Sequence, residues 1–427
     1  MIKKIIANGV DEVNFLGEVR KRQGETDKKI SDIVSDIIDD VRENGDKAVN
    51  AYTEKFDGKL PEYYEVPLDV IHDAVDEADE DFVNALLDAM ENIAAFHHRQ
   101  KEQGFIDPHE NGVILGQRVR GLERVGLYVP GGTAAYPSSV LMNAIPAKIA
   151  GVKEIIMVTP PMKDGRPNPD ILVAASICGV DRVFLTGGAQ AIAALAYGTE
   201  SIPKVDKIVG PGNIYVATAK KLLYGVVDID MIAGPSEILV LADETANPKF
   251  VAADLMSQAE HDVMASSILV TTSEKLVDET IKELERQVKE LSRKDIIEKS
   301  LSTYGAAIVC DCIDCAIELA NELAPEHLEV LLQNPMEYLG RLDNAGSIFL
   351  GQYAPEPLGD YYAGPNHVLP TSGTARFFSP LSVNSFTKRT SYIYYTEQAL
   401  LDAKTDIVTI AEKEGLTAHA NAIKVSF

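Results

Sequence analysis

Short apolar runs alternate with segments of helical periodicity from about residue 120 to residue 350 of the chain. In the first part of this stretch the apolar runs predict buried strands at 124–129, 154–159, 182–185 and 207–209. Helices are expected between and after these strands, at 138–150, 168–179, 189–197 and 213–224. Strands that alternate with helices need right-handed crossover connections, so the pattern predicts a largely parallel sheet.

The same alternation returns after residue 237. Strands are expected at 238–242, 268–272, 306–310, 328–332 and 347–350. Helices are expected at 248–264, 274–292 and 312–323. Because 427 residues are too many for one ordinary hydrophobic core, the two stretches predict an α/β fold with two related Rossmann-like units. Each unit is expected to hold an incomplete, mostly parallel sheet.

Helical segments lie outside the alternating stretches. Residues 26–46 carry apolar side chains at helical spacing, and a second helix is expected at 80–103. Two more helices, at 400–414 and 417–424, lie in a tail that has no strand to sit against. The chain is thus divided into an N-terminal extension at 1–25, a discontinuous α/β domain made of 26–127 and 238–376, a second α/β domain at 128–237, and a helical tail at 377–427.

Composition excludes several classes of partner. The formal net charge of −25 argues against a nucleic acid or an anionic membrane, because both need a basic surface. The N-terminus has no apolar stretch of signal-peptide length, and no segment approaches the roughly 20 apolar residues of a membrane span. Four cysteines are too few for a disulfide scaffold in a chain of this size. We therefore expect a cytoplasmic protein.

Three of the cysteines lie close together and raise the alternative of a sulfur-ligated metal site. Cys310 ends an apolar run that reads as a buried strand, and Cys312 and Cys315 begin the next helix. Cysteine behaves as a small apolar residue in such places. No second Cys-x-x-Cys pair answers this one elsewhere in the sequence, so the packing interpretation is favoured.

Four clusters of polar residues stand out in the last part of the chain. They are Ser-Gln-Ala-Glu-His-Asp at 257–262, Pro-Glu-His at 325–327, Gly-Asp-Tyr-Tyr-Ala-Gly-Pro-Asn-His at 359–367 and Thr-Ala-His at 417–419. Four of the eight histidines of the chain lie in these clusters, each beside carboxylates or amides. Such an inventory of metal ligands and proton carriers favours an enzyme.

Two imidazoles, an amide and a carboxylate make a plausible zinc set. Gln258 and His261 are three residues apart on an expected helix, hence on one face, although a surface pair explains this spacing equally well. Asp360 lies between Gly359 and Gly364, which suit a loop around a site, and an Asp that caps a turn is the alternative. With His419 these residues supply two nitrogens and two oxygens, which suit zinc, and Mn or Co can fill the same ligands in vitro.

The Glu326–His327 pair follows Pro325, at the mouth of an expected strand. In a regular strand the two side chains point to opposite faces, so both reach one site only if the proline makes the backbone irregular. A histidine that titrates near neutrality and a glutamate tuned by burial suit general-base chemistry. A salt-bridged strand end is the alternative.

Three glycine turns connect strands to helices, at 128–132, 186–190 and 210–213. Each can bring backbone amides or a helix N-terminus close to a phosphate, and together they predict a ligand cleft in the 128–237 domain. The usual Gly-x-Gly-x-x-Gly fingerprint is absent, and no acidic ribose-reading residue is visible after the turns.

The chain resembles the histidinol dehydrogenase family nearly from end to end. The resemblance rests on Tyr-Val-Pro-Gly-Gly (128–132), Gly-Gly-Ala-Gln-Ala (187–191), Gly-Pro-Gly-Asn (210–213), Ala-Gly-Pro-Ser-Glu (233–237), Gln-Ala-Glu-His-Asp (258–262), Pro-Glu-His-Leu (325–328) and the run from Gly359 to Thr371. It implies a cytoplasmic zinc enzyme that oxidises L-histidinol through L-histidinaldehyde to L-histidine with two NAD. This is the last step of histidine biosynthesis.

The resemblance also implies residue roles. One zinc per subunit is held by Gln258, His261, Asp360 and His419, and Glu326 and His327 transfer protons. Substrate is contacted by Ser236, His367 and Glu414 together with Gln258, His261, His327, Asp360 and His419, and NAD by Tyr128, Gln190 and Asn213. The tail is expected to enter the neighbouring subunit of a homodimer, where Glu414 and His419 complete the partner's site.

Two other classes of protein use some of the same residues. A zinc hydrolase can employ the same ligands with Glu326 activating water, but it has no use for three glycine turns. A metal-stabilised binding protein without catalytic activity accounts for the cleft but not for the adjacent Glu-His pair.

Overall fold

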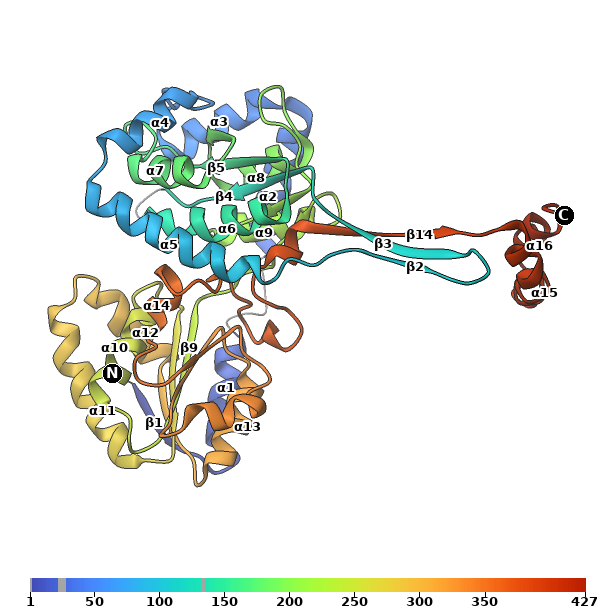
Figure 1. Ribbon diagram of the computed structural model, residues 1–427. Coiled ribbons are helices and arrows are strands. Elements are labelled where there is room, and N and C mark those ends of the chain that lie inside the picture. The colour runs from blue at the N-terminus through green and yellow to red at the C-terminus, as the bar shows by residue number, and fades with distance from the viewer. Residues whose placement is uncertain (1, 22–27, 132–134) are drawn as a thin grey trace.

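Two parallel β-sheets organise the computed structural model, which describes residues 2–21, 28–131 and 135–427 (Figure 1). Gly132, the last residue of the first predicted glycine turn, lies outside the described residues. The predicted α/β class with mostly parallel sheets is confirmed. No helix among the described residues is long and apolar enough to cross a membrane.

The six-stranded sheet has the order β1-β11-β10-β9-β12-β13, and every neighbouring pair is parallel. Its strands are β1 (Lys3–Ile6), β9 (Glu237–Ala242), β10 (Ser266–Thr271), β11 (Ala306–Val309), β12 (His327–Leu331) and β13 (Ser347–Leu350). Its helices are α1 (Asp11–Lys21), α10 (Pro248–Ala259), α11 (Glu274–Gln287), α12 (Lys294–Tyr304) and α13 (Ile313–Leu323).

Alternate residues of the central strand β9 face two separate cores. Leu239 and Leu241 pack in one core with α1 and α13, whereas Ile238 and Val240 pack in the other with α10, α11 and α12. A strand buried on both faces reads as a continuous apolar run, which is why periodicity located it within a residue. The expected 1–25 extension is corrected here, because β1 pairs with β11 and α1 covers one face of the sheet.

The five-stranded sheet has the order β6-β5-β4-β7-β8 and is also parallel. Its strands are β4 (Arg124–Tyr128), β5 (Glu154–Thr159), β6 (Arg182–Leu185), β7 (Lys207–Val209) and β8 (Asp228–Ile229). Helices α6 (Pro137–Ala150), α7 (Pro169–Cys178), α8 (Gly188–Tyr197) and α9 (Ile214–Leu223) follow the strands. In both sheets, with the edge strand β1 left aside, the first strand (β9 or β4) lies centrally, and the chain reverses direction across the sheet after the third, as in Rossmann-like folds.

Four early helices cover the five-stranded sheet. They are α2 (Lys28–Asn44), α3 (Asp46–Asp57), α4 (Leu68–Glu77) and α5 (Glu80–His98). Helices α2 and α3 share a core with α8 and α9, and α4 and α5 share the core on the opposite face with α6 and α7. These contacts correct the expected grouping of 26–127 with 238–376. Amphipathic helices bury their apolar faces wherever a sheet face is open, and periodicity does not say which sheet that is.

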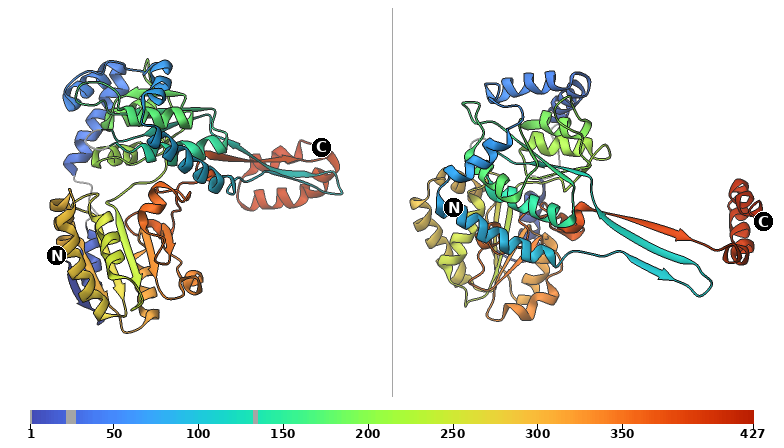
Figure 2. Two further views of the ribbon diagram at one scale, coloured as in Figure 1. Left: turned by 60° about the vertical axis from the view of Figure 1, so that its left-hand side comes forward. Right: turned by 45° about the horizontal axis from the view of Figure 1, so that its top comes forward.

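A long arm projects from the two units and carries the C-terminus at its far end (Figures 1 and 2). Its antiparallel sheet consists of β2 (Phe105–Pro108), β3 (Ile114–Gly121) and β14 (Thr387–Tyr394), in the order β14-β3-β2. The predicted tail helices follow as α15 (Glu397–Lys413) and α16 (Thr417–Lys424). The expectation of a tail without a strand is therefore wrong, because β14 pairs with β3 along eight residues.

Shorter elements complete the fold. They are α14 (Glu356–Tyr361) and the 3₁₀ turns Val288–Glu290, Pro335–Arg341, Thr374–Arg376 and Val383–Phe386. Cys312 caps α13, and its sulfur is bonded to that of the exposed Cys315, so the packing interpretation does not hold for these two cysteines. Cys310 and Cys178 are buried.

Candidate active site

One cavity of about 770 Å³ lies between the two sheets and is lined by both groups of predicted residues. The glycine turns supply Tyr128, Gln190 and Asn213. The polar clusters and the segment before β9 supply Ser236, Gln258, His261, Glu326, His327, Asp360 and His367. Residues separated by more than 200 positions in sequence thus meet at a single site.

The two sheets present opposite ends to the cavity. Tyr128 is the last residue of β4, and the Gly210 turn follows β7, so both lie at the carboxyl ends of strands, where α/β proteins usually bind ligands. His327, by contrast, is the first residue of β12, and Ser236 directly precedes β9. The site therefore combines the ligand-binding edge of one sheet with the amino-terminal edge of the other.

Helix α10 presents Gln258 to the cavity, and the turn that follows it presents His261. The start of the helix was predicted: the side chain of Asn247 accepts a hydrogen bond from the amide of Lys249 at 3.0 Å, and Pro248 occupies the first helical position. Gln258 is buried, and among the described residues its Oε1 has no hydrogen-bond partner. A buried amide oxygen without a donor is costly, so this atom points to a ligand.

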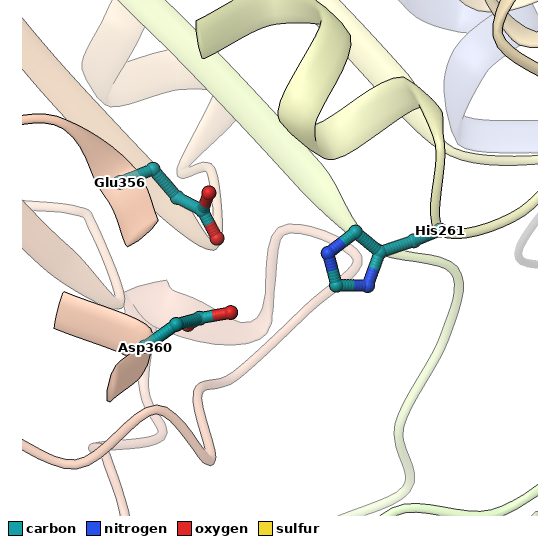
Figure 3. Close-up of side chains that lie close together, drawn as sticks. All are labelled: His261, Glu356 and Asp360. Carbon is teal, nitrogen blue, oxygen red and sulfur yellow. The ribbon is translucent and has the colours of Figure 1, made fainter. Parts of the chain in front are cut away.

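His261, Glu356 and Asp360 form a group suited to a cation (Figure 3). One ligand atom from each lies within 4.8 Å of those of the other two. Asp360 belongs to helix α14, not to the expected loop. Glu356 begins the same helix, and a spacing of four residues places both carboxylates on one face.

Glu356 was missed by the sequence analysis. It is 2% exposed, accepts a hydrogen bond from Ser257 Oγ at 3.1 Å, and its Oε1 has no partner among the described residues. The spacing of four to Asp360, with prolines on both sides of Glu356, is a signal that could have found it. A glutamate between two prolines is typical of a solvated turn, so the local sequence does not mark Glu356 as a buried residue.

Buried acid surrounds this group. Burial, and then the neighbouring Asp360, raises the pKa of Glu356 to about 8, and burial raises that of Asp360 to about 6. Behind them, burial raises the pKa of Asp254 to about 6 and that of Glu329 well above its usual range. Buried carboxylates are seldom left without a compensating charge, so a cation is the chemistry that fits.

Without a metal ion, the buried carboxylates should lower the free energy of unfolding of the protein. The pKa of Glu356 is raised in the folded state to about 8, so its contribution to stability is present below about pH 4.5 and is lost as pH rises toward 8. We expect Glu356→Gln to gain stability relative to wild type between pH 5 and pH 8, measured by urea unfolding. Glu244→Gln, at an exposed position, is the control and should track wild type at every pH. Added zinc should reverse the sign of the difference, and parallel pH curves for Glu356→Gln and wild type would contradict the expectation.

His327 is held in one tautomer. Its Nδ1 lies 3.0 Å from the carbonyl oxygen of Glu237, which can only accept, so Nδ1 carries the proton. Nε2 is then an unprotonated acceptor, and it has no hydrogen-bond partner among the described residues. Burial lowers the pKa of His327 to about 4, so the ring is neutral at physiological pH.

Glu326 directly precedes β12, and its side chain lines the same cavity as that of His327. Its Oε2 accepts a hydrogen bond from the amide of Glu237 at 2.9 Å, and burial raises its pKa well above the usual range. The irregular backbone expected at Pro325 is present, because Ala324 adopts a left-handed conformation with φ 50°. The salt-bridge alternative fits poorly, since Nδ1 of His327 is committed to the Glu237 carbonyl and lies 3.7 Å from Glu326.

His367 adds a third imidazole to the cavity. Its Nδ1 lies 3.1 Å from the carbonyl oxygen of Asp360, which fixes the proton on that nitrogen by the same reasoning. Burial lowers the pKa of His367 to about 4. Two neutral imidazoles beside a cluster of carboxylates make a site that can accept a proton from a bound alcohol.

The glycine turns are held by specific contacts. Tyr128 Oη accepts a hydrogen bond from the amide of Gly188 at 3.2 Å, where α8 begins, and Asn213 caps α9. The backbone of Gly210 has φ 110°, and a Cβ there would lie 2.1 Å from the carbonyl oxygen of Tyr128, so only glycine fits.

A buried ion pair clamps the Gly210 turn. Lys220 Nζ donates to the Gly210 carbonyl at 3.0 Å, and Asp230 Oδ2 accepts from the Gly210 amide at 2.8 Å. Lys220 and Asp230 also bond to each other. The loop conformation is thereby fixed before any ligand binds.

Comparison with known proteins decides the family. The histidinol dehydrogenase family model matches residues 20–427. The chain is 60% identical to the histidinol dehydrogenase of Clostridium acetobutylicum, over 100% of this chain and 99% of that one. The chain belongs to the histidinol dehydrogenase family. A 56% identical relative, covering 99% of both chains, is the histidinol dehydrogenase of Listeria monocytogenes serovar 1/2a.

A solved structure shares the histidinol dehydrogenase fold described above. The crystal structure of histidinol dehydrogenase from Elizabethkingia anophelis superposes with a TM-score of 0.93 at 40% identity, covering 100% of this chain and 98% of that one. The resemblance stated from the sequence motifs is therefore confirmed, and so is the expected enzyme class, a dehydrogenase.

Two residues expected in a histidinol dehydrogenase site are absent from the cavity of this chain. Glu414 follows α15 and His419 lies on α16, and both are exposed. These helices lie at the end of the arm, away from the two units (Figure 1). The fold brings together the other ten predicted site residues and leaves these two outside.

Proposed function

We propose that this protein oxidises L-histidinol to L-histidine in two steps, through L-histidinaldehyde, with two NAD as acceptors. Membership of the histidinol dehydrogenase family supports the reaction. The observation that carries it is the free acceptor Nε2 of His327, which lies in one cavity with Glu326, the acidic cluster and three glycine turns. A cytoplasmic location, as for other steps of amino-acid biosynthesis, is part of the proposal.

Zinc fits the residues that gather at α10 and α14. Gln258, His261 and Asp360 would hold one ion per subunit, and the unpartnered Oε1 of Gln258 together with the raised pKa of Asp360 supports a cation there. When bound, zinc supplies a fixed positive charge that anchors the imidazole and the amine of histidinol. Glu356, whose carboxylate lies in the same group as His261 and Asp360, would add negative charge around the ion.

His327 is the base of the alcohol oxidation. Its Nε2 faces the cavity without a proton, and the hydrogen bond from Nδ1 to Glu237 keeps the ring in that orientation. Accepting the hydroxyl proton raises the electron density on the carbinol carbon, from which a hydride leaves for bound NAD. His367 and Ser236 line the same cavity and are placed to contact the substrate.

Glu326 serves the aldehyde oxidation. Its carboxyl group is buried beside His327, and burial raises its pKa well above the usual range, which makes the carboxylate a stronger base toward water. Water added to the aldehyde forms a hydrate, and loss of a second hydride from this hydrate gives the acid. The enclosed cavity keeps the aldehyde away from bulk solvent between the steps.

Tyr128, Gln190 and Asn213 are proposed to hold NAD. Each lies at a glycine turn on the carboxyl edge of the five-stranded sheet, next to the start of a helix. Helix N-termini favour the negative charge of a pyrophosphate. A zinc hydrolase, the alternative function, leaves this whole half of the cavity unused.

A second copy of the chain is proposed to complete the site with its tail. The arm holds its helices away from the core of its own chain, and it exposes large apolar side chains. They are Phe105, Ile106, Ile393, Tyr394, Ile410 and Val425. Exchange of the arms in a homodimer would bury such side chains and bring Glu414 and His419 to the partner's cavity.

The product ratio tests the proposed reaction. Zinc-loaded protein incubated with limiting L-histidinol and excess NAD should form two molecules of reduced nicotinamide for each molecule of histidine. A simple alcohol dehydrogenase would give one and accumulate the aldehyde. Absence of any reduced nicotinamide, with zinc and both substrates present, would contradict the proposal.

A further inference from the structure

One wall of the cavity has no role in the reaction as described. It is formed where α3 ends, by Phe56 and Asp57, which line the cavity together with Tyr128, Gly187 and Gly188. Helix α3 packs against α8, so this wall belongs to the five-stranded sheet and its glycine turns.

Asp57 carries an unsatisfied carboxylate oxygen. Its Oδ2 is buried and has no hydrogen-bond partner among the described residues, although the side chain lines an open cavity. Burial raises the pKa of Asp57 to about 6. Such an atom is costly unless a ligand donates to it, and the two oxygens of a carboxylate can accept from a pair of neighbouring hydroxyl groups.

The carboxylate lies close to a residue that the glycine turns position. Burial, with a smaller contribution from the charge of Asp57, raises the pKa of Tyr128 to about 12, so its hydroxyl stays protonated. Because Tyr128 Oη accepts from the Gly188 amide, Asp57, Tyr128 and the start of α8 form one continuous polar surface. Next to it, the ring of Phe56 is 53% exposed and offers a face on which an aromatic base can stack.

The direction of a bound dinucleotide follows from the chemistry. The nicotinamide must lie near the carbinol carbon, hence beside His327 at the edge of the six-stranded sheet. The adenosine half then lies toward the five-stranded sheet, where Phe56 and Asp57 stand. A ribose placed there can turn its vicinal hydroxyls toward Asp57 Oδ2, which has no hydrogen-bond partner among the described residues.

We propose that Asp57 accepts hydrogen bonds from the adenosine ribose of the dinucleotide and thereby selects NAD over NADP. The inference rests on the proposed function, because it assumes a dinucleotide in this cavity. A 2′-phosphate cannot donate these bonds, and its charge is repelled by the carboxylate. Rossmann-like enzymes usually place such an acid after the glycine-rich turn, whereas here it comes from a helix that precedes the sheet in sequence.

Binding of reduced nucleotides tests the proposal without any turnover. NADH and NADPH fluoresce, so their dissociation constants can be titrated directly for wild type, Asp57→Asn, Asp57→Ser and the control Glu54→Gln. Glu54 lies on the same helix but is exposed, so its variant should behave as wild type. Wild type should prefer NADH by about 100-fold, and Asp57→Asn should bind NADH about tenfold more weakly, with the preference reduced by about tenfold or more.

Asp57→Ser keeps a small polar side chain and should bind NADPH more tightly than wild type, because the repelling charge is gone. An unchanged NADH-to-NADPH ratio in both folded variants overturns the proposal, as does a wild type that binds the two nucleotides equally or binds neither. Selective binding that depends on Asp57, in protein that fails to oxidise histidinol, supports the proposal and instead contradicts the proposed reaction.

Discussion

Replacing His327 by asparagine should lower kcat for histidinol oxidation by about 10³-fold while zinc content stays at the wild-type level. The asparagine amide can still donate to the Glu237 carbonyl, as Nδ1 of His327 does at 3.0 Å, so the fold around the site is kept. The substitution removes Nε2, the acceptor that has no hydrogen-bond partner among the described residues. Stopped-flow measurement of reduced nicotinamide, with metal analysis of the same sample, gives both quantities.

The matched control is His98→Asn, which makes the same chemical change at an exposed position on α5. It should retain full activity. Because burial lowers the pKa of His327 to about 4, wild type should not lose activity through this group until pH falls toward that value. Near-normal turnover in His327→Asn would remove His327 from the proton-transfer step.

The sequence predicted the central strands and helices closely because they are buried on two faces or follow clear caps. Strand β5, for example, begins and ends where the apolar run 154–159 does. It missed β14, because Thr-Lys-Arg-Thr-Ser-Tyr-Ile-Tyr is exposed on the arm and shows no apolar face. Strand β14 forms by pairing with β3, which lies far away in the sequence, so no local pattern marks it as a strand.

The grouping of helices with sheets failed for a different reason. Helix α2 has a strong apolar face, but the sequence does not say whether β4–β8 or β9–β13 receives it. Convergence of the site residues was likewise not visible from spacing. Ten of them meet in one cavity because the carboxyl edge of one sheet faces the amino edge of the other. Glu356 and Asp57 stand out in the structure because each has a buried carboxylate oxygen without a hydrogen-bond partner among the described residues.

The second large effect is expected from the proposed exchange of tails between two copies of the chain. In that arrangement a working site takes His327 from one chain and His419 from the other. His327→Asn and His419→Ala should each be nearly inactive as purified homodimers, the second because the zinc loses a ligand. Neither variant should change the fold of the two units, since His419 is exposed on α16.

A mixture of the two variants should nevertheless regain activity. A heterodimer holds one site with both lesions and one site with neither, so its second site is intact. Random pairing of equal amounts makes half of the dimers heterodimers, and about one quarter of all sites become active. If His419 instead acts on its own chain, every site in a heterodimer carries one lesion.

Subunit complementation is therefore the most direct test of a site built from two sheets of one chain and the tail of another. The two variants are unfolded together, refolded with zinc, and assayed with histidinol and NAD against wild type treated in the same way. Recovery of about one quarter of the wild-type rate is predicted. A mixture no more active than either variant alone would contradict the exchange of tails and the zinc site that depends on it.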